Sequence, residues 1–258
     1  MAAEYTASTS RIAVAAATSI NNLQNASICA WVWVDTFPVL ITYLFHKKPA
    51  DNHFLRFYGT GTGLEYLFSR ATTDQTVYSV LTNFAHWGTG KWVFIASTAD
   101  NTTDANNKLY MGDLTNPPTE PSSYGGQQAG SGTFSDESAV VLNIGQNGAN
   151  QAYLDGRLGP YYVFNTTLSA VQVYQVWRSA GLGIGGNVLH FEPGWTGVSS
   201  IVDYSGHGNT GTGTTISQVA HPGVLNPFAW HRAARGIDGA VAATTTDPGI
   251  TSPYGWFA

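Results

Sequence analysis

One stretch of the chain carries the signals of a helix at both of its ends, and it lies among segments of β type. Residues 151–181 read QAYLDGRLGPYYVFNTTLSAVQVYQVWRSAG. Ser169 stands at an N-cap position, and Gln172 completes a capping box three residues later, while Gly181 suits a left-handed C-cap. We therefore expect one helix over Ser169–Ala180. No other segment carries comparable signals, so we expect this helix to lie across a sheet.

The apolar residues of this segment predict which side of the helix is covered. Val171, Tyr174 and Trp177 recur at a spacing of three, with Val173 and Val176 beside them. Residues at this spacing share one side of a helix. We expect that side to pack on the sheet, with Leu168 and Val173 forming a hydrophobic staple at the N-terminus.

Most of the remaining chain alternates in the manner of β-strands. The clearest strand is Ser27–Asp35, which places Ile28, Ala30, Val32 and Val34 on one face and Cys29, Trp31 and Trp33 on the other. Apolar residues on both faces indicate an inner strand that is covered on both sides. Further strands are expected at residues 11–16, 39–47, 53–59, 63–70, 76–84 and 139–145, with a long loop at 117–132.

The composition of the chain argues against some classes of binding partner. Of the 258 residues only 10% are charged, and the formal net charge of −5 argues against a nucleic-acid partner, which requires a concentrated basic surface. No stretch approaches the roughly 20 apolar residues of a membrane span, and no signal peptide is evident. The single Cys29 lies in an apolar run and is expected to be a buried, inert thiol. We expect a protein that is made and folded in a cytoplasm and reaches any place outside it by assembly, lysis or a dedicated secretion route.

Three motifs resemble the laminin-G-like branch of the concanavalin-A-like jelly rolls. The first is LDGRLG followed by YYVFNTTLSAVQVYQVW, in residues 154–177; the second is KWVFIASTAD with KLYMGDL, in residues 91–114. The third is FEPGWTGVSSIVDYSGHGNTG, in residues 191–211. The resemblance implies an all-β, two-sheet antiparallel jelly-roll sandwich of about a dozen strands with one short helix.

The third motif stands after the helix, whereas the family normally begins with it. Residues 188–216 therefore either complete a permuted sandwich or form an appended piece. We favour the first arrangement, because a separate strand pair would be marginally stable. We expect a domain over residues 1–216, followed by an extended C-terminal arm over 217–258. The arm has lost all alternation, and its large apolar residues are predicted to dock on another surface: Trp230, Tyr254, Trp256 and Phe257.

No catalytic residue is predicted. Glycoside hydrolases need two carboxylates roughly 5–9.5 Å apart, and none of the five glutamates has an acidic partner two residues further along a strand. We therefore expect a protein without enzymatic activity. A free carbohydrate-binding module or a glycoside hydrolase of the same fold is the alternative.

Ligand sites are predicted with less support from the residues themselves. The resemblance implies calcium at a rim of the sandwich, with Asp100, Asp104, Asp155 and Asp203 as candidate ligands. Pyranose rings stack on aromatic side chains, and the loop aromatics are the candidates for glycan contact: Trp87, Tyr124 and Trp195.

These expectations combine into a functional hypothesis. Laminin-G-like domains of this type are implied by the resemblance to occur in phage structural proteins. We expect a surface subunit of a virion, such as a capsid decoration, head-fibre or tail-associated protein. It would form a homo-oligomer, contact a capsid or tail protein through the arm, and bind surface glycans.

Overall fold

The chain folds into two antiparallel β-sheets, as a computed structural model shows for residues 2–37, 41–47, 53–101, 106–134, 136–149, 152–179, 184–193 and 197–219. The helices of the described part are η1 (Thr18–Ile20), η2 (Leu81–Asn83) and α1 (Ala170–Ser179). The first ten strands are β1 (Ala2–Tyr5), β2 (Arg11–Val14), β3 (Ala26–Thr36), β4 (Ile41–Lys47), β5 (His53–Tyr58), β6 (Gly63–Phe68), β7 (Gln75–Val80), β8 (Trp92–Ala99), β9 (Lys108–Asp113) and β10 (Gly126–Gln128). The others are β11 (Leu142–Ile144), β12 (Asp155–Phe164), β13 (Asn187–Phe191), β14 (Ser200–Ile201), β15 (Gly211–Thr214) and β16 (Ile216–Val219).

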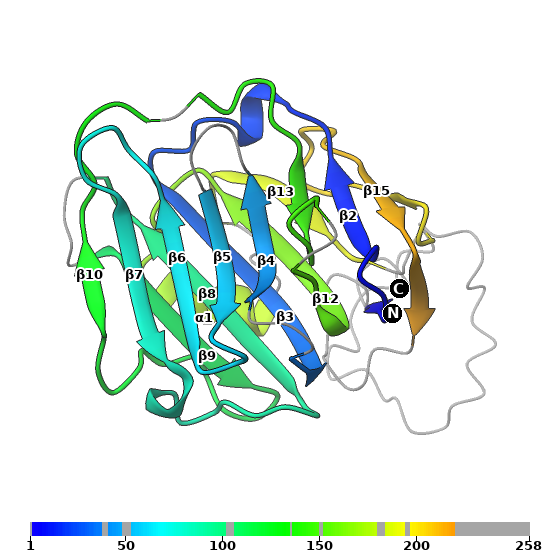
Figure 1. Cartoon of the computed structure of the whole chain (residues 1–258), viewed down its shortest axis with the longest axis horizontal. Helices are drawn as coiled ribbons and strands as arrows, with labels where there is room; N and C mark the ends of the chain where they lie inside the picture. The colour runs from blue at the N-terminus through cyan, green and yellow to red at the C-terminus, as the bar shows by residue number, and fades with distance from the viewer. Residues whose placement is uncertain are drawn as a thin grey trace, which may run out of the picture. The chain divides into compact units, whose positions relative to one another are not determined.

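The seven-stranded sheet has the order β16-β1-β12-β3-β8-β9, with β13 also paired to β12. The nine-stranded sheet has the order β10-β7-β6-β5-β4-β11-β2-β15-β14. Figure 1 shows β4 to β7 and β10 in front of β3, β8 and β9. The expected fold class, a two-sheet antiparallel jelly-roll sandwich with one short α-helix, is confirmed. The described residues contain more strands than the dozen expected, because several have only two to four residues.

The core lies between the sheets and takes one face of each strand. Ile28, Ala30, Val32 and Val34 of β3 are buried there, as their alternation predicts. From the other sheet the same cluster takes Leu55 and Phe57 of β5, Leu64 and Tyr66 of β6, and Val77 of β7. The two apolar faces hide each other from water, which is the main driving force for this architecture.

The second face of the seven-stranded sheet is also covered. Trp31 of β3 meets Phe94 of β8 edge to face, with 5.5 Å between ring centroids. Figure 1 shows α1 behind this sheet, and the indole N–H of Trp177 donates to the Asp113 carbonyl of β9 at 2.9 Å. Cys29 is buried on this face, and burial raises the pKa of its thiol. The expected inner strand and its buried thiol are confirmed.

Helix α1 begins as the sequence predicts but presents a different side to the sheet. The Ser169 hydroxyl accepts from the Gln172 N–H at 3.3 Å, and the Gln172 side chain accepts from the Ser169 N–H at 2.9 Å. Val173 and Val176 are buried, whereas Val171 is 67% exposed and Tyr174 is 36% exposed. The predicted covered face was wrong at Val171 and Tyr174. The sheet covers the neighbouring stripe, which consists of Val173 and Val176.

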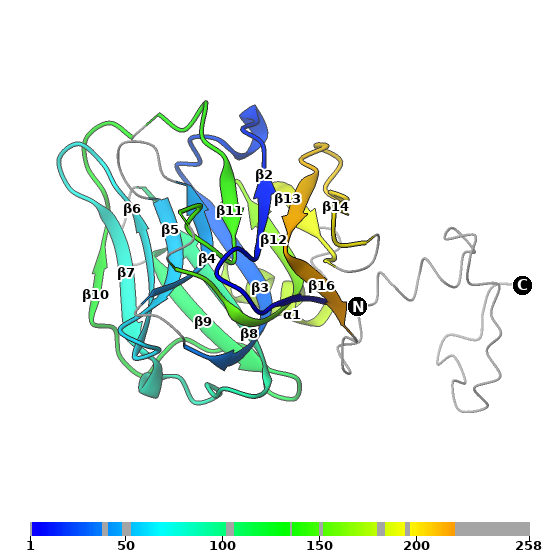
Figure 2. The ribbon, with the colours of Figure 1, turned by 45° about the vertical axis from the view of Figure 1, so that its right-hand side comes forward.

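The strands that follow the helix belong to both sheets. β13 pairs with β12, β16 pairs with β1, and β15 joins β14 to β2. Val188, Leu189, Phe191 and Ile201 enter the core. Figure 2 shows β14 and β16 on the side of the sandwich that carries β2 and β12. Residues 187–219 thus supply strands to the sandwich, and β16 reaches Val219, beyond the expected boundary at residue 216.

The described residues form part of one compact unit, which spans Met1–Gly223. None of their helices has the length and apolarity needed to cross a membrane. The four aromatic residues of the predicted arm, Trp230, Tyr254, Trp256 and Phe257, lie outside the described residues. β10 lies inside the predicted loop 117–132, where its short sequence GQQ gives no strand signal.

Candidate functional site: the outer face of the nine-stranded sheet

The outer face of the nine-stranded sheet carries no helix in the described part of the chain, and its side chains form transverse rows. Antiparallel partners point to the same face, so the register defines each row from β4 across to β7 or β10. The central row runs Tyr43, Arg56, Glu65, Tyr78 and Gly126. The rows on either side are Ile41, Tyr58, Gly63 and Val80, and His46, Phe54, Leu67, Thr76 and Gln128.

Two tyrosines of this face lie across glycines. A Cβ atom placed on Gly63 would stand 2.1 Å from the Cζ atom of Tyr58. A Cβ on Gly125 would stand 2.2 Å from the Cε2 atom of Tyr78, and one on Gly126 would stand 2.6 Å from its Cε1 atom. Each ring therefore occupies the space that a side chain on the neighbouring strand would fill. One side of the ring rests on backbone and the other is turned away from it.

An ion pair on an aromatic floor lies beside the two tyrosines, because Arg56 is two residues from Tyr58 on β5 and Glu65 is the cross-strand partner of Tyr78. The Nη2 and Nε atoms of Arg56 approach Oε2 of Glu65 at 2.8 and 2.9 Å. The guanidinium carbon lies 4.0 Å from the centroid of the Phe54 ring, within the range of a cation–π contact. Both charged side chains remain partly exposed, so they are available to a ligand while holding each other in place.

The charged pair acts on the hydroxyl of Tyr58. Partial burial raises the pKa of Tyr58, and Glu65 and Tyr78 raise it further, while Arg56 acts in the opposite direction. Tyr58 is thus a neutral hydroxyl at physiological pH, able both to donate and to accept a hydrogen bond. On the β4 side the face is bounded by Ala152, which packs with Tyr43 and Phe54.

The aromatic residues predicted from the loops take part in packing. Trp87 is half-buried against the core, and its ring centroid lies 5.1 Å from that of Phe57 and 6.0 Å from that of Phe37. Tyr124 is half-buried as well, and its hydroxyl accepts from the Leu109 N–H at 3.2 Å and lies 3.1 Å from Glu120 Oε2. Trp195 lies outside the described residues. Their roles in glycan contact remain predictions.

The aspartates proposed as calcium ligands stand on separate elements. Asp100 follows β8 and accepts from the Asn106 amide at 2.8 Å, while Asp155 begins β12 and accepts from the Thr36 hydroxyl at 2.5 Å. Asp104 lies outside the described residues. In the part of the chain that is described, no three His, Cys, Asp or Glu side chains gather as metal ligands would. A calcium site built on loop carbonyls stays a prediction.

Asp203 organises its own loop. Its Oδ1 atom accepts from the N–H groups of His190 at 3.0 Å and Ser205 at 2.9 Å. Its Oδ2 atom accepts from the Ser205 hydroxyl at 2.8 Å and the Asn209 N–H at 2.9 Å. Four hydrogen bonds give the aspartate a structural role, and the bond from the Ser205 hydroxyl explains why Ser follows Asp two residues later in the motif DYSGHGN.

Sequence reasoning missed Tyr58, Tyr78, Arg56 and Glu65. Alternation within HFLRFYG, GLEYLF and TVYSV separates these residues from the buried Phe57, Leu64 and Val77, so the outward side of each strand was visible. The register between strands, which brings the four residues into adjoining rows, is absent from the sequence of any one strand.

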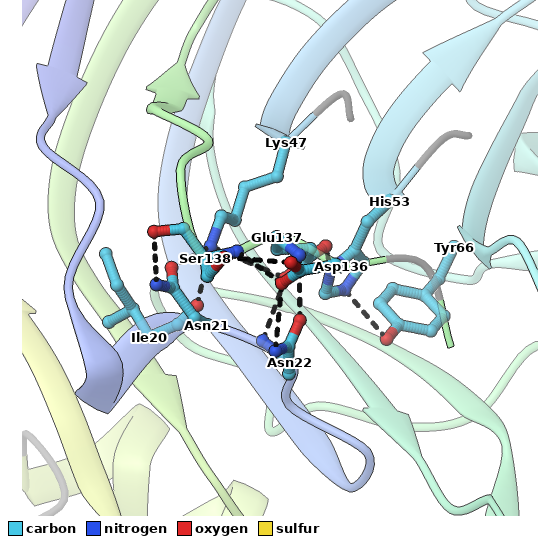
Figure 3. A network of polar contacts seen from close by, with 9 residues as sticks. All are labelled: Ile20, Asn21, Asn22, Lys47, His53, Tyr66, Asp136, Glu137 and Ser138. Atoms are coloured by element: carbon cyan, nitrogen blue, oxygen red, sulfur yellow. Dashed lines mark hydrogen bonds and ion pairs between the residues drawn. The ribbon is translucent and has the colours of Figure 1, made fainter. Parts of the chain in front are cut away.

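A second concentration of ionisable groups is buried at one end of the core (Figure 3). His53 Nδ1 lies 2.7 Å from Glu137 Oε1, and Lys47 Nζ lies 3.4 Å from Glu137 Oε2. Lys47 also donates to the Ile20 carbonyl at 2.9 Å and to Asn21 Oδ1 at 2.6 Å. His53, Lys47 and Glu137 are fully buried, so this network ties loops to strands and offers no surface to a ligand.

Burial and the neighbouring charges have opposite effects on the pKa values of Glu137 and Lys47. Burial alone would raise the pKa of Glu137, but His53, Lys47 and the N–H of Asn22 keep it below its ordinary value. Burial lowers the pKa of Lys47, and Glu137 offsets part of that effect. The carboxylate accepts the Nδ1–H of His53, and the other ring nitrogen then faces the Tyr66 hydroxyl at 3.1 Å.

Comparison with one solved structure supports the fold, and two others match with lower TM-scores. A candidate carbohydrate-binding protein from Bacteroides ovatus matches with a TM-score of 0.55 and 17% identity, over 87% of this chain and 61% of that protein. A heptameric SAP-like pentraxin from Limulus polyphemus matches with a TM-score of 0.45 and 13% identity, over 68% and 80% of the two chains. The enzymatically active domain of tailspike protein 2 of bacteriophage CBA120 matches with a TM-score of 0.41 and 13% identity, over 59% and 24%.

The chain spans about three fifths of the length of the Bacteroides ovatus protein. A scan of protein-family models and a search of curated proteins find no match. At these identities the likenesses concern the sandwich fold.

Proposed function

We propose that the chain is a non-enzymatic, carbohydrate-binding sandwich of a virion surface protein, and that it binds through the outer face of the nine-stranded sheet. The observation that carries the proposal is the pair of tyrosines seated on glycines beside a partly exposed Arg56–Glu65 pair. Sugar rings present C–H groups that pack on aromatic rings and hydroxyls that bond to charged side chains. The likeness in fold to a candidate carbohydrate-binding protein supports the same function.

The acidic residues of this face favour binding over hydrolysis. A glycoside hydrolase places two carboxylates on either side of the scissile bond, roughly 5–9.5 Å apart. The three rows of the outer face contain Glu65 as their acidic residue, and it is bonded to Arg56. A carboxylate engaged by a guanidinium and without a second carboxylate opposite it in these rows lacks the acid–base pair that hydrolysis needs.

A glycan-array measurement combined with a hydrolysis assay tests this proposal. The full chain should retain at least one immobilised glycan. Incubation with the same glycan in solution should release no new reducing ends. Release of reducing ends would favour the alternative, a glycoside hydrolase of this fold. Failure to retain any glycan would remove the carbohydrate-binding function.

The virion setting rests on the laminin-G-like resemblance and on a composition with 10% charged residues and one cysteine. In this setting the chain forms a homo-oligomer, as a capsid decoration, head-fibre or tail-associated subunit. Its C-terminal residues contact a capsid or tail protein. Antibodies against the chain should label purified particles, and the chain should co-sediment with them. A chain recovered only from the soluble fraction of lysed cells would contradict the setting and favour a free carbohydrate-binding module.

A further inference from the structure

We propose that Tyr58 and Tyr78 form a two-ring platform for a neutral oligosaccharide, with Arg56 and Glu65 bonding to hydroxyls beside the rings. The proposal rests on carbohydrate binding as the function and specifies the residues and the class of ligand. It is carried by the glycines beneath the rings, by the spacing of the two tyrosines and by the charges of the face.

The glycines beneath the rings have no backbone reason to be glycine. Gly63, Gly125 and Gly126 are not among the glycines with positive φ. Gly63 and Gly126 belong to strands, where glycine is unfavourable compared with residues that pack on a pleated surface. What requires glycine here is the ring itself, since any Cβ would stand within 2.6 Å of a tyrosine ring atom. The sequence thus keeps both rings flat against the sheet, and a flat ring presents its face to a ligand.

The spacing of the tyrosines excludes a single sugar as the complete ligand. Tyr58 is on β5 and Tyr78 is on β7, two strands apart and one row along the sheet. With strands about 4.8 Å apart and a rise of about 3.4 Å per residue, the two Cα atoms are about 12 Å apart. Both rings lean the same way, Tyr58 over β6 and Tyr78 over β10, so the ring separation is similar. A chain of linked sugars can stack on both rings, whereas one hexose cannot.

The charged pair beside the rings favours an uncharged ligand. Arg56 and Glu65 are the charged residues of the three rows, and they neutralise each other. A sulfated, phosphorylated or sialylated sugar would need a cation that is free of its own partner. Hydroxyl groups suit the pair better, because they donate to the carboxylate and accept from the guanidinium.

The experiment measures binding of the full chain to neutral hexasaccharides of glucose, xylose, mannose and galactose, to the matching monosaccharides, and to sialylated and sulfated glycans. Three variants test the platform: Tyr58→Ala, Tyr78→Ala and Gly63→Ala. The last keeps both tyrosines, but its Cβ atom displaces the Tyr58 ring from its position over residue 63. Tyr174→Ala is the matched control for Tyr78, because the two side chains are 36% and 37% exposed. Gly185→Ala is the control for Gly63, because a Cβ there meets no atom within 4 Å.

The expected result is binding of a neutral hexasaccharide that each platform variant weakens by about tenfold or more and that the controls leave unchanged. Melting curves close to wild type show that the tyrosine variants are folded. Glycan binding that survives in all three platform variants would overturn this platform and leave the carbohydrate-binding function in place. Binding of acidic glycans alone, or of monosaccharides as tightly as hexasaccharides, would overturn the ligand class. A chain that binds no glycan would overturn both proposals.

Discussion

The Glu137 carboxylate is buried, and it is stabilised by three donors that come from separate parts of the chain. Lys47 ends β4, His53 begins β5 and Asn22 belongs to the loop before β3. A buried ion pair contributes little compared with an apolar substitute, but removing one partner leaves a charge without compensation. The contribution of Glu137 to the free energy of unfolding therefore depends on Lys47.

The coupling between these two residues can be measured. Glu137→Gln should lower the free energy of unfolding by about 3–5 kcal/mol, because Lys47 is then buried without its charged partner. Lys47→Met combined with Glu137→Gln should cost less than the sum of the single changes. Urea unfolding of the four proteins gives the coupling energy. Additive effects would show that the two charges do not depend on each other.

The same carboxylate predicts a loss of stability in acid. The pKa of Glu137 is lower in the folded chain than its ordinary value of 4.5. Its contribution is therefore complete above that value and declines as the pH falls toward the folded pKa. The wild-type chain should lose more unfolding free energy than Glu137→Gln between about pH 5 and pH 2. Parallel pH curves for the two proteins would exclude Glu137 as a source of acid sensitivity.

Gly156 is a residue for which the backbone itself demands glycine. Its φ angle is 153°, and a Cβ atom would stand 1.9 Å from the Trp33 carbonyl oxygen of the adjacent strand. The register of β12 against β3 shifts at this position, as in a β-bulge. Gly156→Ala should destabilise the chain by about 3 kcal/mol, as measured by urea unfolding. Gly185→Ala, in open space, should have little effect; equal losses in the two variants would refute the steric argument.

At the scale of the elements, the burial of α1 differs between two neighbouring stripes of apolar residues. Val171 and Val173 are two positions apart, yet the first is 67% exposed and the second is buried. Val173→Ala should lower the unfolding free energy by about 2 kcal/mol, because it removes two methyl groups from a packed site. Val171→Ala should change it by less than about 0.5 kcal/mol. Thermal melts of the two variants decide the matter, and a larger loss at Val171 would mean that this side of the helix is covered.

Local sequence signals predicted those elements whose capping residues or apolar pattern are distinctive. The capping box of Ser169 and Gln172 located the start of α1, and the double-faced apolar run Ser27–Asp35 located the central strand β3. β1 and β10 escaped prediction, because AAEY and GQQ are too short to show alternation. The covered side of α1 was misplaced, because the choice between two neighbouring apolar stripes is made by the sheet beneath.

The outer face of the nine-stranded sheet could not be assembled from the sequence for a related reason. Tyr58, Glu65 and Tyr78 come from three strands, and each strand shows its outward side correctly by alternation. What brings the residues together is the pairing of β5 with β6 and β6 with β7. That register depends on turns and on core packing, which span the whole sheet. Loop aromatics such as Trp87 were favoured instead, although they fill the edge of the core.

At the scale of the whole molecule, both sheets are completed by the segment that follows the helix. β13 covers the second half of β12, β15 covers β2 and β16 covers β1. Without these strands the backbone groups of β1, β2 and β12 would have unpaired edges, which invite association with other chains. The core would also lose Val188, Leu189, Phe191 and Ile201.

Two truncations test where the folding unit ends. A chain that stops at Gly223 contains the complete compact unit, so it should unfold cooperatively and melt within a few degrees of the full chain. A chain that stops at Gly186 lacks β13 to β16 and should show no cooperative melt, because both sheets lose an edge and the core loses four apolar side chains. Circular dichroism and calorimetry distinguish these outcomes. A cooperative melt of the shorter chain would mean that residues 187–219 are an appendage of a sandwich that is already complete. If the chain ending at Gly223 also binds the glycan of the full chain but no longer sediments with particles, carbohydrate binding belongs to the sandwich and attachment belongs to the C-terminal residues.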